Sequence, residues 1–163
     1  MSKIINLTVE EIGLGARAGL KQFNKKFYRS KGSKNRLENH VTGKLGEIAY
    51  CKFTGHKINL EHYEHCGDGG IDAEDGSQIK TVMWTGPNKQ IKISKSDHDA
   101  ALKNNSLKNY VLAAMDPSNG GEIIEIIGYI SKENFNKKYH TEEKWGDGLL
   151  VVDEDQLDFY YEK

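Results

Sequence analysis

Asp72, Gln78 and Lys80 are the side chains whose types and spacing in this sequence point to chemistry. They lie in the segment 66–80, CGDGGIDAEDGSQIK, and residues 74–77 are a hairpin-turn signal between them. In a hairpin centred on residues 75 and 76, Asp72 faces Lys80 and shares one face with Gln78. A carboxylate and a second oxygen ligand can hold Mg²⁺, and a lysine can orient a water or offset charge on a phosphate. The pattern therefore indicates a site for phosphodiester hydrolysis.

The register of this hairpin decides which side chains reach the site. The register above also places Glu74 opposite Gln78, and it puts Ile71, Ala73 and Ile79 on the other face, where they can enter the core. A one-residue slip would instead place Gln78 opposite Ala73. The apolar pattern favours the first register.

The elements that must position this hairpin follow from capping and periodicity. Thr8 and Glu11 form a capping-box pattern that opens a helix towards residue 28, with an apolar stripe at helical spacing. A second helix is expected over 37–53, with Gly55 as its C-cap. The remaining pattern predicts strands at 70–73, 78–84, 90–93, 110–115, 122–130 and 149–152, and short helices beginning at Ser96 and Ser131. We therefore expect an α/β or α+β domain, in which helices flank a mixed central sheet.

The charges are divided unevenly along the chain. Residues 1–45 carry a net charge of +7 and the remaining 118 residues carry −8, although the whole chain has −1. A split of this kind suggests a polyanionic partner for one face. Four of the basic residues surround the turn between the two expected helices, namely Arg29, Lys31, Lys34 and Arg36. We expect them to contact a phosphate backbone, which positions DNA without reading its sequence.

Three short motifs resemble the PD-(D/E)XK nuclease superfamily. Asp72 followed by Gln78-Ile79-Lys80 resembles its D…(D/E/Q)-x-K core, and residues 67–72, GDGGID, are similar to a segment of Mrr-like restriction endonucleases. Residues 43–49, GKLGEIA, resemble the G-x-x-G-E segment of the upstream helix in that superfamily. The strands expected downstream, up to residue 152, are similar to those of small phage-encoded nucleases. The motifs occur in the expected order, but no Pro precedes the aspartate.

This resemblance implies a restriction-endonuclease-like core preceded by two helices, with a role for each motif residue. Asp72 would be the central metal ligand, Gln78 a second ligand and Lys80 the catalytic lysine, while Glu47 would complete the site from its helix. Asp68 is the rival for the role of Asp72. Glu74 is expected to be a surface acid of the turn. Mg²⁺ would be the cofactor, with Mn²⁺ as a substitute and no organic cofactor.

The implied function is a metal-dependent endonuclease that hydrolyses DNA. We expect one domain over residues 1–163, with a basic helix and turn at 1–36, a nuclease core at 37–152 and an acidic element at 153–163. One alternative is a Holliday-junction or branched-DNA resolvase, which in this superfamily acts as a homodimer; others are a restriction-type or nicking enzyme and an inactive nucleic-acid-binding module. A further alternative is a protein-interaction domain that uses its acidic C-terminal residues, Asp153, Glu154, Asp155 and Asp158.

Other functional classes have less support in the sequence. Two cysteines cannot form a disulfide framework, and no apolar run reaches the ~20 residues that span a bilayer. The first residues also lack the long apolar stretch of a secretory signal, so the expected location is the cytoplasm, away from membranes. A zinc site is not expected, since the spacing of the histidines and cysteines matches no paired Cys-x-x-Cys knuckle. The residues concerned are Cys51, His56, His62, His65 and Cys66.

Overall fold

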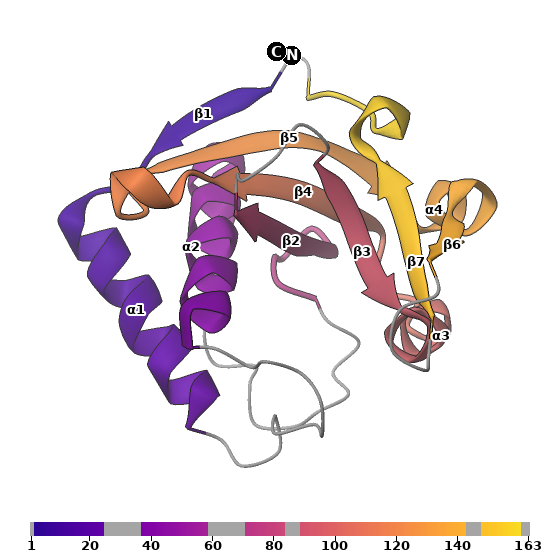
Figure 1. Cartoon of the computed structure of the whole chain (residues 1–163), viewed down its shortest axis with the longest axis horizontal. Helices are drawn as coiled ribbons and strands as arrows, with labels where there is room; N and C mark the ends of the chain where they lie inside the picture. The colour runs from indigo at the N-terminus through magenta and orange to yellow at the C-terminus, as the bar shows by residue number, and fades with distance from the viewer. Residues whose placement is uncertain (1, 25–36, 59–70, 84–88, 143–147, 161–163) are drawn as a thin grey trace.

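The chain folds into two β-sheets with two long helices packed at one side (Figure 1). The computed structural model describes residues 2–24, 37–58, 71–83, 89–142 and 148–160. Helices cover a mixed central sheet, which confirms the expected α+β class.

The first long helix, α1 (Val9–Phe23), begins at the expected capping box. Thr8 Oγ1 accepts a hydrogen bond from the Glu11 backbone N–H at 3.2 Å, and the Glu11 carboxylate accepts one from the Thr8 backbone N–H at 2.7 Å. The helix ends at Phe23, five residues before the expected position. Residues 25–36, which include the four predicted DNA-binding residues, lie outside the described part of the chain.

Helix α1 packs against α2 (Leu37–Thr54) through two glycines as well as through part of its apolar stripe. Gly15 and Gly19 are its buried residues, and a Cβ atom on Gly19 would lie 2.8 Å from Val41 Cα. The side chains of Leu20 and Phe23, which belong to the stripe, are 46% and 36% exposed. The absence of a Cβ lets the two backbones approach closely, so the stripe expected to face the core is turned partly outwards.

The larger sheet holds strands in the order β1-β5-β4-β2. These strands are β1 (Lys3–Asn6), β5 (Ile123–Ser131), β4 (Asn109–Met115) and β2 (Ser77–Met83). Strand β2 is parallel to β4, and the other neighbours are antiparallel. Parallel neighbours need a crossover connection, which here includes β3 (Gln90–Ser94) and helix α3 (Lys95–Lys103). Strand β2 therefore lies at an edge of this sheet.

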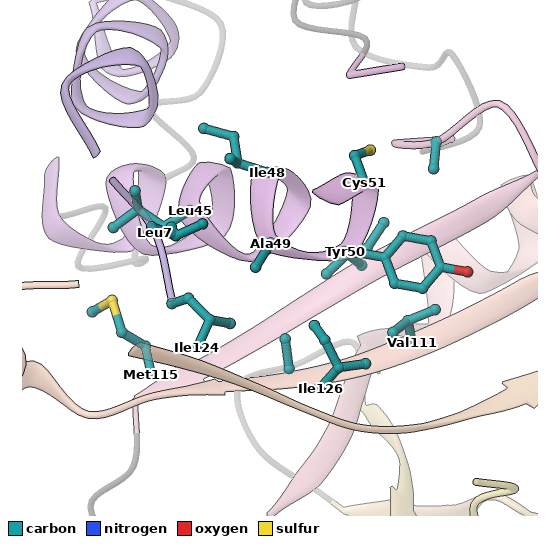
Figure 2. Packing of buried hydrophobic residues seen from close by; sticks show 13 residues of the cluster. Leu7, Leu45, Ile48, Ala49, Tyr50, Cys51, Val111, Met115, Ile124 and Ile126 are labelled. Carbon is teal, nitrogen blue, oxygen red and sulfur yellow. The ribbon is translucent and has the colours of Figure 1, made fainter. Parts of the chain in front are cut away.

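The central strand β4 is buried on both faces. Val111, Ala113 and Met115 belong to a hydrophobic cluster beneath α2, where Figure 2 shows Ile48, Ala49 and Tyr50 of the helix above Val111 and Ile124 of the sheet. The alternate residues Tyr110, Leu112 and Ala114 enter a second cluster with Ile91 and Phe135. Burial on both sides explains the unbroken apolar run that predicted a central strand.

The smaller sheet is antiparallel and has the order β3-β7-β6. Its other strands are β7 (Leu149–Asp153) and β6 (His140–Glu142), and helix α4 (Lys132–Lys138) lies between β5 and β6 in the chain. Strands β1 and β6, of four and three residues, were not expected, because both are too short for a clear alternation. The expected strand at 70–73 is also wrong: Ala73 forms only an isolated bridge, to Ile58.

Both short helices begin after a serine cap, and in one of them the serine differs from the expected one. Ser94, rather than the expected Ser96, caps α3, because its Oγ accepts a hydrogen bond from the Asp97 N–H at 3.1 Å, while Ser131 caps α4 as expected. Two single-turn 3₁₀ helices, η2 (Pro117–Asn119) and η3 (Glu154–Gln156), complete the described elements. No helix in the described part of the chain is both long and apolar enough to cross a bilayer.

Two glycines of α2 give a matched test of its packing on β2. A Cβ atom on Gly46 would overlap the Thr81 hydroxyl and lie 2.9 Å from Thr81 Cβ, whereas one on Gly43 would meet no described atom within 4 Å. We expect Gly46→Ala to lower the free energy of unfolding by roughly 1–3 kcal/mol. Gly43→Ala should raise it by up to about 1 kcal/mol, through helix propensity alone. Urea unfolding of both variants measures this, and equal effects would contradict the close contact at Gly46.

Candidate active site

Helix α2 carries a buried ion pair close to the hairpin. Glu47 is 6% exposed and Lys44, one turn earlier, is 1% exposed. The Lys44 ammonium donates to both carboxylate oxygens of Glu47 at 2.8 Å. Positions three apart share one face of a helix, so the two side chains enter the same region.

Asp72 lies at the end of the described segment that leads into β2. Its Oδ2 accepts a hydrogen bond from the Ile79 N–H at 2.7 Å, and the residue is 9% exposed. In the described sheet β2 is an edge strand, so none of the described strands pairs with this N–H, and the Asp72 carboxylate accepts its hydrogen bond in place of a strand carbonyl. The aspartate is thereby fixed against the strand that carries Gln78 and Lys80.

The hairpin register differs from the expected one. The Gly76 N–H donates to the Ala73 carbonyl at 3.1 Å, and the Ser77 carbonyl accepts from the Asp72 and Ala73 N–H groups at 2.9 and 3.2 Å. The turn is therefore centred on residues 74 and 75, and Asp72 is opposite Ser77 rather than Lys80. Asp72 and Gln78 do not lie on adjacent strands.

The turn is held by its own side chains. Asp75 Oδ1 accepts from the Ser77 N–H at 3.0 Å, a local bond typical of turns that carry Asp. Gly76 has a φ of +86°, and a Cβ there would overlap the Ser106 carbonyl. A glycine is required at this position both by backbone conformation and by space.

Electrostatic interactions connect Asp72 to three other charged residues. Burial and then the Glu47 carboxylate raise the pKa of Asp72 to about 8, while the Ile79 N–H, Lys80 and Lys44 act in the opposite direction. Glu47 and Lys80 are thus both close enough to Asp72 to act on its ionisation. Gln78 is half-buried on β2, two positions before Lys80, and so lies on the same face of the strand.

Lys44 is the member of this group that sequence reasoning missed. It was counted only as one of the basic residues of the first 45. The signal was its position three residues before Glu47, on a helix whose flanking residues Leu45, Ile48 and Ala49 are apolar and buried. A lysine on a buried stripe needs an acidic partner, and the glutamate at that spacing supplies one.

A second polar network links α2 to the turn. The Tyr50 hydroxyl donates to Asp75 Oδ2 at 2.7 Å and lies 3.2 Å from Ser77 Oγ, and the Tyr160 hydroxyl donates to Tyr50 at 3.1 Å. Burial raises the pKa of Tyr50 to about 12, so its hydroxyl remains a donor at neutral pH. His56 Nε2 lies 3.6 Å from Asp75 Oδ2 at the exposed end. Since Tyr50 is one turn after Glu47, this network fixes the glutamate relative to the hairpin.

Several other predicted residues are outside this group. Asp68, His62, His65 and Cys66 lie beyond the described residues, so the choice between Asp68 and Asp72 is not tested. Glu74 is exposed at the turn, as expected for a surface acid. Cys51 is a buried free thiol whose Sγ lies 3.8 Å from the Lys57 carbonyl.

The donor set suits a hard divalent cation. Carboxylate oxygens from Glu47 and Asp72 and an amide oxygen from Gln78 are ligands that Mg²⁺ accepts. A bound divalent cation would also offset the repulsion between the Glu47 and Asp72 carboxylates, which raises the pKa of Asp72. Within the described ranges, no three His, Cys, Asp or Glu side chains gather closely enough to hold a metal by themselves.

Comparisons with known proteins add no assignment. No protein-family model, curated protein or solved structure matches the chain. Function is therefore inferred from the chemistry of the site itself.

Asp72→Asn tests the electrostatics of the site without any substrate. With a folded pKa of about 8, well above the ~3.9 of an unfolded aspartate, the native protein keeps a proton that the unfolded chain releases. Stability should therefore fall as the pH rises from about 4 to about 8. Asparagine does not titrate, so the variant should have a higher melting temperature than the wild type near pH 8 and no such advantage near pH 4.

Thermal unfolding of both proteins in the presence of a chelator measures this difference. Glu74→Gln is the matched control, because it neutralises an exposed acid of the same turn. If the difference in melting temperature between Asp72→Asn and wild type stays constant with pH, the raised pKa of the buried Asp72 carboxyl is contradicted.

Proposed function

We propose that this chain is a metal-dependent endonuclease of the PD-(D/E)XK type that hydrolyses DNA phosphodiester bonds. The observation that carries the proposal is the meeting of Glu47, from α2, with Asp72 and Lys80, from the hairpin and β2. The order of helix, turn and strand, with a glutamate on the upstream helix, agrees with the resemblance in the sequence. Strand β2 is the last strand in the order of the described sheet, and a substrate would approach at this edge.

The site would contain three metal-ligating side chains and one cationic side chain. Glu47 and Asp72 would hold Mg²⁺, with the Gln78 amide oxygen as a neutral third donor. When bound, the ion supplies a water of lowered pKa and polarises a phosphoryl oxygen. Lys80 would place its ammonium where it can orient the attacking water and offset the negative charge that develops on the phosphate.

Asp72 has a second task beyond holding the ion. The hydrogen bond from the Ile79 N–H fixes one carboxylate oxygen at 2.7 Å and sets the direction of the other. A ligand that is held in this way needs little rearrangement when a cation binds, which favours a defined geometry. Gln78 lacks the charge of a glutamate, so cation binding depends mainly on Glu47 and Asp72.

The choice of DNA as substrate comes from charge. Arg29, Lys31, Lys34 and Arg36 precede α2 directly in the chain, and α2 carries Glu47. A basic segment that directly precedes, in the chain, the helix of a proposed phosphodiester-hydrolysing site suits a polyanion. A reducing cytoplasm is part of the proposal, since Cys51 is a free thiol.

Cleavage assays on variants test the assignment directly. We expect the wild type to cut supercoiled plasmid or a four-way junction with Mg²⁺ or Mn²⁺ and not with chelator. Asp72→Asn should reduce cleavage by orders of magnitude while DNA binding survives, and Lys80→Ala should do the same while metal binding survives. Gln78→Glu adds a negative ligand and should tighten metal binding. Glu74→Gln, the exposed neighbour, should cleave as wild type.

The outcomes separate the alternatives. Selective cutting of the junction over plasmid would indicate a resolvase, and accumulation of open circles would indicate a nicking enzyme. Normal cleavage by Asp72→Asn together with loss in Asp68→Asn would transfer the central role to Asp68. If neither substitution changes cleavage, the nuclease assignment fails.

A further inference from the structure

The Lys44 ammonium is bound to the Glu47 carboxylate, which the proposed function assigns as a metal ligand. Its Nζ is 2.8 Å from each oxygen of Glu47, and the side chain is 1% exposed. Both oxygens therefore face a positive charge that is shielded from water. Asp72 also senses this charge, because Lys44 opposes the rise in its pKa.

The Lys44 ammonium compensates the Glu47 carboxylate before any metal arrives. The pKa of Asp72, raised to about 8, opposes a second negative charge at neutral pH, and Lys80 and Lys44 act against this rise. A buried charge requires an opposite charge nearby, because burial removes its hydration and only such a partner offsets the lost free energy. A divalent cation added at Glu47 would lie beside the Lys44 ammonium in a region of low dielectric constant, where like charges repel strongly.

We propose that Lys44 is the internal counter-cation of the Glu47–Asp72 pair, and that a divalent cation binds by displacing its ammonium from Glu47. The inference depends on the proposed function only for the statement that a metal binds. It adds that the metal-free site is stabilised by Lys44, and that metal affinity is set by an exchange of one cation for another. Lys44 is a positioning residue in this account, since it acts through Glu47.

A purely structural ion pair would behave differently. If Glu47 served only to neutralise Lys44, removal of the lysine would leave metal affinity unchanged or lower it. Under the exchange, its removal takes the competing ammonium away from Glu47 and raises the affinity for the metal. Lys80 is the natural comparison, because it also acts on Asp72 but makes no ion pair within 4 Å in the described structure.

Mn²⁺ binding without DNA tests the exchange. Titration calorimetry on the full chain compares wild type with Lys44→Gln, Lys44→Arg and Lys80→Gln. We expect Lys44→Gln to bind Mn²⁺ about tenfold more tightly than wild type, which is the factor that corresponds to ~1.4 kcal/mol. Lys44→Arg keeps the charge and should bind as wild type, and Lys80→Gln should gain less than Lys44→Gln.

Lys44→Gln leaves two buried carboxylates with less compensation, so it should also be less stable without metal. If it does not fold alone, the Mn²⁺ concentration that restores its near-ultraviolet circular dichroism replaces the titration. Folding restored by Mn²⁺ and not by Na⁺ at equal ionic strength supports the exchange, and failure of both ions overturns it.

The titration distinguishes a failure of the Lys44 proposal from a failure of the metal site. Equal Mn²⁺ affinity of Lys44→Gln and wild type would overturn the role of Lys44 and leave the nuclease proposal in place. No Mn²⁺ binding by any of the four proteins, wild type included, would overturn the metal site itself.

Discussion

The close approach of α2 to the edge strand β2 is the constraint on which the site depends. Gly46 leaves space for Thr81 at one point of this contact, and Tyr50 bonds to Asp75 one turn further along. Glu47 lies between these two points in the helix sequence, so its position follows from both. Without the close approach, the glutamate and Asp72 would belong to separate parts of the molecule and could not affect each other's ionisation.

This contact brings like charges together in a buried region, which opposes stability. The structure offsets the cost with the ammonium of Lys44, the N–H of Ile79 and the more distant Lys80. Neither lysine belongs to the hydrophobic cluster between α2 and β4. Polar groups that a fold must compensate so carefully are typical of sites selected for chemistry rather than for stability.

Much of the fold follows from local signals in the sequence. The capping box at Thr8, the glycine after α2 and the apolar run of β4 each have a local cause, and the structure confirms them. The order of three short motifs predicts that Glu47, Asp72 and Lys80 belong to one site, and in the structure Glu47 and Lys80 act electrostatically on Asp72. The register of the turn was not predictable, because the Asp72 carboxylate bonds to the backbone of Ile79 and so competes with strand pairing.

The other errors have a common origin in contacts between distant segments. The outward turn of Leu20 and Phe23 results from glycines of α1 that admit the backbone of α2, and hydrophobic periodicity does not register such a contact. The pairing of Lys44 with Glu47 was visible only as a spacing of three residues. Strand β1 depends on a partner more than a hundred residues away.

That distant pairing has a consequence for the order in which the molecule is assembled during synthesis. Lys3 pairs with Ile126, so β1 cannot dock on the sheet until β5, more than a hundred residues later in the chain, has been made. Tyr160 then closes the network around Tyr50 from the other end of the chain. Contacts of such long sequence separation slow folding. The helical pair α1 and α2 is therefore synthesised long before Tyr160, and the hydrogen-bond network around Tyr50 is completed only after residue 160 has emerged.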